Sequence, residues 1–175
     1  STVGHMATNR PIGERPAMAA YGTDSPEWEA LPWSWAAERL IPNKNYWLVT
    51  VSADQAPHAL PVWGVWNDDD LRFMFSCASS ARKARNIAAN PRVLFTVDST
   101  VECVSVEGNA ASITDPSRID TWIDRYVAKY SGEVPEGLGD FVRKHAMFEV
   151  VPTTAFAIIE REAEFATRAT RWRFT

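Results

Sequence analysis

Apolar and polar residues alternate through the middle of the chain with a period of two, which is typical of strands that bury one face. Gly108 in the fifth of these runs predicts a bulge or a bend, and Pro61 in the second predicts an edge, a bulge or irregular pairing. The pattern predicts strands over residues 46–51, 57–66, 71–76, 93–97, 101–113 and 154–160. Short antiparallel strands with few helices predict a mainly β protein with flanking helices, built around a small barrel.

A helical period is clearest over residues 116–130, where apolar side chains recur every three or four positions. Asp115 is the expected N-cap of this helix, and Pro116 occupies its first position. The alternating cations and aromatic rings of residues 170–174 suit a strand edge or a docked terminus. Shorter helices are expected over residues 33–40, over 141–147, and after the Ser25–Pro26 pair.

The segment between the third predicted strand and the next helix carries the most informative chemistry. The strand ends at Ser76, and a short helix follows, with Ser79 or Ser80 as its expected N-cap. Arg82 and Lys83 then lie in the first helical turn, where the helix dipole disfavours cations. A phosphate bound among the hydroxyl groups, the free backbone N–H groups and the two cations would remove this conflict. The alternative is a pair of solvated basic side chains on an exposed turn.

Length and charge limit the organisation and the partners of the chain. Its 175 residues, 46% of them hydrophobic, suit one domain with a core. The net charge is −4 and the only dense basic cluster is residues 82–85, so nucleic-acid binding is not expected. No segment approaches the ~20 apolar residues of a membrane span. Residues 1–6 are interpreted as a cloning remnant, 7–45 as an irregular and partly helical leader, and 46–175 as a single domain.

Cysteine and tryptophan usage adds two further constraints. Cys77 and Cys103 lack metal-ligand spacing, which favours a reduced, cytoplasmic protein, although one disulfide between them stays open. The eight tryptophans could belong to a core, a subunit contact or a pocket for a polycyclic ligand. Composition does not distinguish these roles.

Motifs for common side-chain chemistry are missing from the sequence. It contains no Gly-rich nucleotide fingerprint, Walker-type loop or nucleophile elbow. His58 and His145 lack metal-binding spacing, and His58 is interpreted as a strand residue at a pocket wall or core edge. The acidic residues 68–70 are interpreted as a solvated turn and not as a calcium loop. No catalytic side chain and no metal site are therefore predicted, which favours a bound cofactor as the carrier of any reaction.

The order of these segments resembles the flavin/deazaflavin oxidoreductases, the split-barrel relatives of pyridoxamine 5'-phosphate oxidase. The resemblance covers roughly residues 46–172 and lies in PHALPVWGVW at 57–66, KARNI at 83–87 and NPRV at 90–93. The aromatic leader and the TRWRF ending at 170–174 are more similar to the actinobacterial branch that uses coenzyme F420. The implied fold is a split β-barrel, and the implied assembly is a homodimer with two cofactor sites at the subunit interface.

The same resemblance implies roles for individual residues. The cofactor phosphate would be held by Ser76 and Lys83, with Arg82 and Arg85 as helpers. The second strand would flank the tricyclic ring, and the C-terminal segment would reach the site of the partner. The residues so implicated are His58, Pro61, Val62 and Trp63 on the strand, and Trp172 and Arg173 in the C-terminal segment.

Three functions are compatible with this interpretation. The first is a reductase that transfers a hydride from reduced coenzyme F420 to a conjugated, electron-poor small molecule, with solvent as a sufficient proton source. The second is an FMN-binding oxidase or reductase on the same barrel, because both cofactors carry a phosphate. The third is a non-catalytic cofactor, tetrapyrrole or haem binder with His58 as a possible axial ligand.

Overall fold

The structure is a computed structural model that describes residues 9–134 and 136–175. The segment interpreted as a cloning remnant, residues 1–6, lies outside the described residues. The strands are β1 (Gly13–Glu14), β2 (Asn45–Val51), β3 (Pro57–Asn67), β4 (Arg72–Cys77), β5 (Arg92–Thr96), β6 (Glu102–Ser112), β7 (Ala146–Ile159) and β8 (Thr170–Arg173). The helices are η1 (Ala19–Tyr21), α1 (Trp33–Leu40), α2 (Arg82–Ala89), α3 (Pro116–Tyr130), α4 (Leu138–Arg143) and α5 (Phe165–Arg168).

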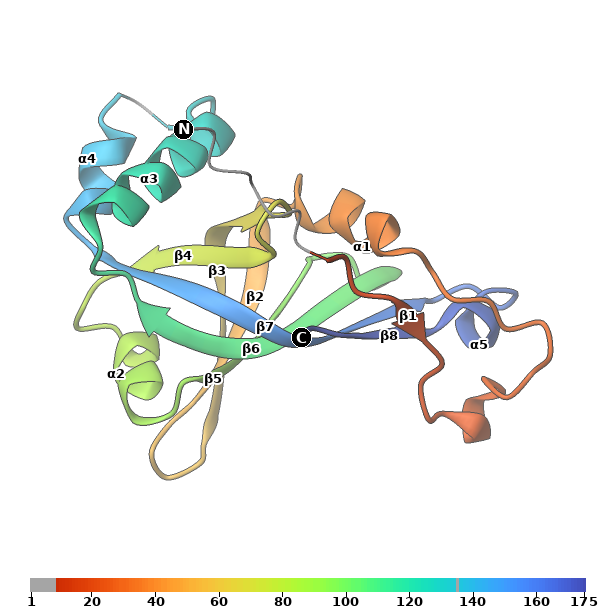
Figure 1. Ribbon diagram of the computed structural model, residues 1–175. Coiled ribbons are helices and arrows are strands. Elements are labelled where there is room, and N and C mark those ends of the chain that lie inside the picture. Colours follow the sequence, from red (N-terminus) through yellow and green to blue (C-terminus); the bar gives the residue numbers. More distant parts are fainter. Residues whose placement is uncertain (1–8, 135) are drawn as a thin grey trace.

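Six strands close into an antiparallel barrel (Figure 1). They follow the order β7-β4-β3-β2-β5-β6, and β6 pairs back onto β7 to complete the ring. The register shifts between Glu107 and Gly108, where the sequence predicts a bulge. On the other side of β7, strands β8 and β1 extend the sheet beyond the barrel. The predicted fold class, a mainly β barrel with flanking helices, is confirmed.

Aromatic side chains fill the barrel. Along β2 the inward residues Tyr46, Leu48 and Thr50 are buried and alternate with more exposed neighbours. Phe73 and Phe95 stack at the centre with their ring centroids 4.0 Å apart. Gly64 lies so close to this stack that a Cβ added there would come within 2.3 Å of the Phe73 ring. The barrel therefore needs a glycine at this point of β3.

Helix α3 has the predicted bounds and the predicted cap. Asp115 accepts a hydrogen bond from the backbone N–H of Arg118 at 2.9 Å, and it satisfies one of the free donors of the first turn. The apolar stripe of the helix packs Trp122, Ile123 and Tyr126 against Val65 and the remaining apolar side chains of a second core. Among the described residues, no helix is long and apolar enough to cross a membrane.

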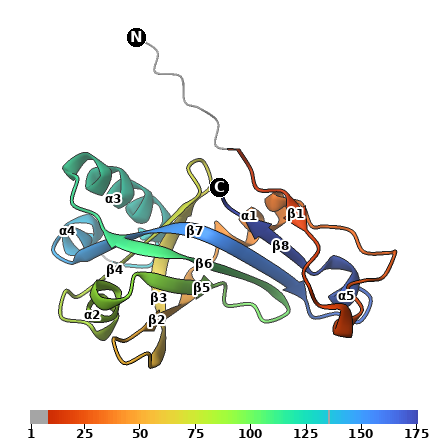
Figure 2. The ribbon, with the colours of Figure 1, turned by 60° about the horizontal axis from the view of Figure 1, so that its bottom comes forward.

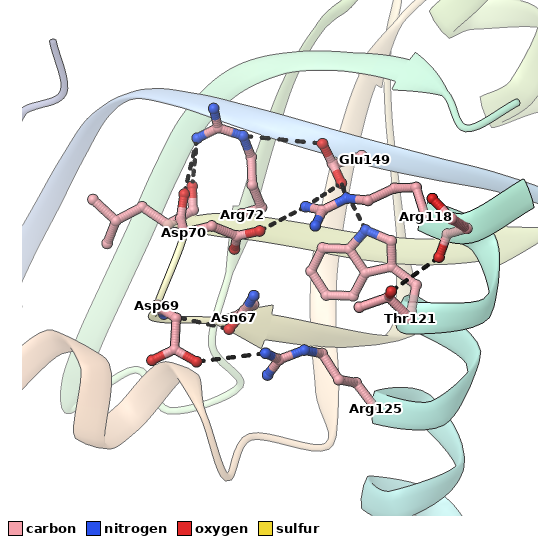
Figure 3. A network of polar contacts seen from close by, with 11 residues as sticks. Asn67, Asp69, Asp70, Arg72, Arg118, Thr121, Arg125 and Glu149 are labelled. Carbon is pink, nitrogen blue, oxygen red and sulfur yellow. Dashed lines mark hydrogen bonds and ion pairs between the residues drawn. The ribbon is translucent and has the colours of Figure 1, made fainter. Parts of the chain in front are cut away.

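A polar network fixes α3 to the strands beneath it (Figure 3). The Arg118 guanidinium bridges Asp70 and Glu149, with a distance of 2.7 Å to each carboxylate. The indole of Trp122 donates to the same Glu149 at 2.6 Å, and Arg125 pairs with Asp69 at 3.4 Å. The acidic turn interpreted as merely solvated is thus an anchor for α3.

Two predicted helices are wrong. The Ser25–Pro26 pair begins a turn, because the backbone of Glu29 bonds to Thr167 and the indole of Trp28 bonds to Ala169, and both contacts pull this segment away from a helical path. The helix expected over residues 141–147 is α4, which ends at Arg143. Ala146 already pairs with Cys77 of β4, so the last long strand begins there and not at residue 154.

The leader and the tail are joined. Gly13 of β1 pairs with Trp172 of β8, and Leu31 donates its backbone N–H to the buried Thr170 hydroxyl at 2.9 Å. The prediction that residues 170–174 form a strand edge or a docked terminus is confirmed by this pairing. The extension built by β1, β8 and α5 lies at the opposite end of the subunit from α2 (Figure 1, Figure 2).

Candidate functional site

The first half of β3 has a free edge. Residues 57–63 pair with β2 on one side, whereas β4 pairs only with residues 64–67 on the other. No other strand of the described residues pairs with this half of β3. Pro61, which has no N–H to donate, lies within this stretch, so the prediction of an edge at Pro61 is confirmed. Unpaired backbone groups are therefore available for a ligand or a partner along residues 57–63.

Helix α2 packs beneath the β2–β3 hairpin through a buried polar contact. The Asn86 amide donates to the Thr50 hydroxyl at 2.9 Å, and both side chains are buried. Thr50 is the direct cross-strand partner of His58. Arg82 lies four residues before Asn86, on the same face of α2. This contact brings the start of α2 to the side of the hairpin that carries His58.

The start of α2 differs from the prediction in its cap. The N-cap residue is Ala81, with no side-chain hydrogen bond, and not Ser79 or Ser80. The backbone N–H of Ala81 donates to the Ala78 carbonyl and closes a tight turn. Ser79 and Ser80 are the two central residues of this turn and therefore precede the helix. Ser79 and Ser80 are both exposed. Arg82 occupies the first helical position, as expected, and the uncapped N–H groups remain unsatisfied by side chains.

Arg82 and Lys83 are unpaired cations at the disfavoured end of a helix. Within the described ranges neither side chain forms an ion pair or a hydrogen bond, whereas Arg85 donates to the Ser80 carbonyl. Most other arginines of the described chain pair with carboxylates. Within the described residues no carboxylate forms an ion pair with Arg82 or Lys83, and the nearest electrostatic partner is Asp54, whose charge interacts with Arg82 at longer range.

Electrostatic effects connect this cation pair to its neighbours. Burial lowers the pKa of His58, and the charges of Arg82 and Lys83 lower it further. Burial raises the pKa of the Cys77 thiol at the end of β4, and Lys83 opposes this shift. The hydrogen bond from Ser52 lowers the pKa of Asp54, and Arg82 adds to that effect. The positive charge at the start of α2 thus acts to lower the pKa of His58, of Cys77 and of Asp54.

Three further residues predicted for the site lie on β3 and β4. Val62 is buried in the barrel, and Trp63 is half-buried and stacks on Tyr130 of α3 at 4.5 Å with nearly parallel rings. Ser76 alternates with Cys77 along β4 and shares the side of Met74, whose side chain packs in the core beneath α3. The Ser76 hydroxyl is therefore directed to the other face of β4 from Cys77.

The C-terminal candidates lie elsewhere in the subunit. Trp172 is fully buried and packs edge-on against Trp33 at 5.4 Å. Arg173 pairs with Glu14 of β1 at 2.7 Å. Trp172 is thus a core residue of its own chain and has no exposed surface to offer to a cofactor. The alternation of aromatic residues and cations, which predicts a strand edge or a docked terminus, arises because β8 buries one face more than the other.

Sequence reasoning missed the residues that hold the helices against β3. Lys129 of α3 donates to the Tyr46 hydroxyl and to the Gly64 carbonyl, each at 2.9 Å. Its burial lowers the pKa of the amine to about 8. Tyr130 also bonds to Gly64 through its hydroxyl. No sequence signal marks Lys129, because a lysine on an amphipathic helix is ordinarily assigned to the solvated face.

The outer face of the barrel beside this site is apolar. Trp47, which is 48% exposed, lies between Pro61 of β3 and Thr96 of β5 in the sheet register. Val49 lies on the same face, opposite Leu94 of β5. The hollow next to them, of about 590 Å³, is lined by residues of β2, β5, β6 and β7. This face adjoins the free edge of β3.

Comparison with known proteins identifies the family of this chain. Residues 36–159 match the pyridoxamine 5'-phosphate oxidase family, and this match covers more than half of the chain. The chain belongs to this family. No curated protein matches this family member in sequence. The resemblance to the split-barrel superfamily is thereby confirmed.

Solved structures of low identity share the fold of this family member. A conserved hypothetical protein from Mycobacterium tuberculosis is 18% identical, with a TM-score of 0.62 over 75% of this chain and 86% of that one. An F420 reductase is 24% identical, with a TM-score of 0.54 over 71% and 98%. The heme storage protein HutZ from Vibrio cholerae is 20% identical, with a TM-score of 0.56 over 71% and 90%. At such identities the likeness establishes the split barrel and not the cofactor.

Proposed function

We propose that this protein is a coenzyme F420-dependent oxidoreductase that transfers a hydride from the reduced deazaflavin to a conjugated, electron-poor small molecule. The observation that carries the proposal is the pair of unbalanced cations, Arg82 and Lys83, at the start of α2. A phosphate suits this position because free N–H groups and two positive charges converge there. Membership of an oxidase family and likeness to an F420 reductase support the redox assignment.

The chain's own residues would bind and orient the cofactor. Arg82, Lys83 and Arg85 would hold its phosphate, with Ser79 and Ser80 in the adjoining turn. The free edge of β3, from His58 to Trp63, would flank the ring system with unpaired backbone groups. When bound, the deazaflavin supplies the hydride chemistry, and the protein contributes proximity, orientation and exclusion of water. No side chain is assigned as catalytic, and solvent suffices as the proton source.

FMN on the same barrel is the second candidate. The family to which the chain belongs is named for an oxidase, and the anion site at α2 recognises the phosphate that both cofactors share. The local chemistry of α2 therefore does not distinguish FMN from coenzyme F420.

We further propose that two copies associate through the apolar outer face that includes Trp47 and Val49. A solvent-exposed tryptophan on an apolar sheet face next to an unpaired strand edge is typical of a surface that is covered in the assembly. A second copy would cover the cofactor at the free β3 edge, which adjoins this face, while the cation pair lies on the opposite side of the hairpin, where Asn86 contacts Thr50. The cytoplasmic location predicted from cysteine usage is compatible with this proposal, and both thiols are free.

Substitution of Trp47 with aspartate is expected to convert the dimer to a monomer. A charge at the centre of an apolar contact must be desolvated without a partner. Size-exclusion chromatography with light scattering measures the mass directly. The matched control is Tyr21→Asp, which alters an exposed aromatic residue on η1 and should leave the mass unchanged. A monomeric parent protein, or a dimeric Trp47→Asp variant, would exclude this interface.

Titration of the purified protein with coenzyme F420 and with FMN, side by side, tests the function. We expect saturable binding of coenzyme F420 by fluorescence and enzyme-dependent oxidation of its reduced form in the presence of a quinone-type acceptor. Yellow protein that retains FMN on purification would favour the second candidate. A haem absorption band on addition of haem, with no turnover of either cofactor, would instead indicate a tetrapyrrole binder.

A further inference from the structure

We propose that His58 couples phosphate binding to the uptake of one proton. An anion seated between the imidazole and the start of α2 would be contacted by a protonated Nε2 of His58, together with Arg82 and Lys83. This inference rests on the proposed phosphate site and assigns a specific role to a residue that was otherwise expected only to line the pocket.

The register of the hairpin places His58 at the cation pair. His58 and Thr50 are direct cross-strand partners, so their side chains lie on the same face of the hairpin. Asn86 is bonded to Thr50 at 2.9 Å, and Arg82 lies one helical turn before Asn86. A ligand at the start of α2 therefore lies within reach of the imidazole.

The two ring nitrogens of His58 have different surroundings. Nδ1 is buried and has no hydrogen-bond partner within the described residues, whereas Nε2 is not buried in this way. The accessible nitrogen is therefore Nε2, and in the protonated ring this nitrogen carries an N–H whichever nitrogen holds the hydrogen of the neutral ring. In the free protein, burial and the charges of Arg82 and Lys83 keep the pKa of His58 below its ordinary value. The unliganded imidazole is consequently neutral at pH 7.

The other titratable or charged groups around His58 do not outweigh the positive charge of Arg82 and Lys83. On α2 they are Arg82, Lys83 and Arg85, all cationic. On the hairpin Asp54 is an anion that Arg82 already stabilises. At the end of β4 the Cys77 thiol has a pKa raised by burial, so it stays neutral at pH 7. The surroundings of His58 are thus dominated by positive charge until an anion arrives.

A bound anion removes the electrostatic cost of protonating His58. Its negative charge offsets the two cations, a proton from solvent binds the ring, and the Nε2–H of the imidazolium donates to a phosphate oxygen in a charge-assisted hydrogen bond. The pKa of His58 is then higher in the complex than in the free protein. Affinity is therefore greatest below the free pKa and falls as the pH rises toward the pKa of the complex, by up to about tenfold per pH unit.

NMR titration of the His58 ring, with sulfate as the probe, tests the coupling. Sulfate does not change its own protonation in this range, so any change belongs to the protein. We expect sulfate to raise the pKa of His58 and to leave that of His145, the internal reference, unchanged. An unchanged His58, or an equal shift at both histidines, would overturn the inference.

Calorimetry with coenzyme F420 gives an independent measure of the proton. Binding in buffers of different ionisation enthalpy should report net uptake approaching one proton between the two pKa values of His58. His58→Asn keeps a hydrogen-bond donor but cannot titrate, so its binding should lose the proton uptake and the pH dependence. Equal proton uptake by the variant contradicts the role of His58. Tight binding of coenzyme F420 without proton uptake overturns this inference alone, whereas a sulfate-induced shift without binding of coenzyme F420 or FMN overturns the proposed function alone.

Discussion

Replacement of Lys83 with glutamate is expected to weaken coenzyme F420 binding by at least about tenfold. A charge-assisted hydrogen bond contributes about 1.5–3 kcal/mol, and each 1.4 kcal/mol corresponds to a factor of about ten in affinity. Reversal of the charge removes this contact and adds repulsion between the new carboxylate and the phosphate. The folded protein should tolerate the change, because Lys83 has no ion pair or hydrogen bond within the described part of the chain. Fluorescence titration of the two proteins measures the difference.

Lys144→Glu provides a charge-matched control for this experiment. Lys144 is an exposed residue that follows α4, far from α2 in the sequence and on another element. The variant has the same net charge as Lys83→Glu and should bind the cofactor like the parent protein. If Lys83→Glu also binds like the parent, the phosphate is not held at α2. If both variants weaken binding equally, the effect belongs to net charge and not to the site.

Trp172→Ala is expected to destabilise the fold by about 3–5 kcal/mol, the usual loss for a fully buried aromatic residue. Trp172 has no exposed surface, and it contacts Trp33 where β8 joins the leader through β1. Its removal leaves a cavity beneath both terminal segments. Urea denaturation, with the same change in signal for parent and variant, measures the loss in the free energy of unfolding.

The conservative variant Trp172→Phe separates packing from ligand contact. It should lose less stability than the alanine variant, and the folded fraction of both should bind coenzyme F420 with unchanged affinity. A selective loss of cofactor affinity in Trp172→Phe, without loss of stability, would return this residue to the binding site.

Local signals predicted much of the fold. Helix α3 was located to the residue, because Asp115 and Pro116 define its start and its apolar stripe is uninterrupted. The long strand β7 was recognised only in its second half. Its first half begins directly after α4, and Ala146 and Met147 become strand residues by pairing with β4, which is a long-range contact invisible to a local pattern. Leader strand β1 has two residues and forms only because β8 lies beside it.

One part of the candidate site, the cations at the start of α2, can be predicted from the sequence. Arg82 and Lys83 stand at the first positions of α2, as the sequence indicates, because the turn before them can be recognised from its small residues. The N-cap was wrong, since a tight turn closed by Ala78 and Ala81 displaces both serines. The contact between Asn86 and Thr50 could not be predicted, because it depends on how α2 docks beneath a hairpin formed by other residues.

The free edge of β3 also acts as a ruler. A strand advances about 3.4 Å per residue, so the five steps from His58 to Trp63 cover about 17 Å. At the far end Trp63 stacks on Tyr130 on the other face of β3 from His58, and the bonds of Tyr130 and Lys129 to Gly64 hold this end in place. The length of a molecule that is anchored at α2 and runs along this edge therefore decides which of its atoms reaches the Trp63 end. Insertion or deletion of two residues between His58 and Trp63 would preserve the side-chain alternation and move the Trp63 end by about 7 Å.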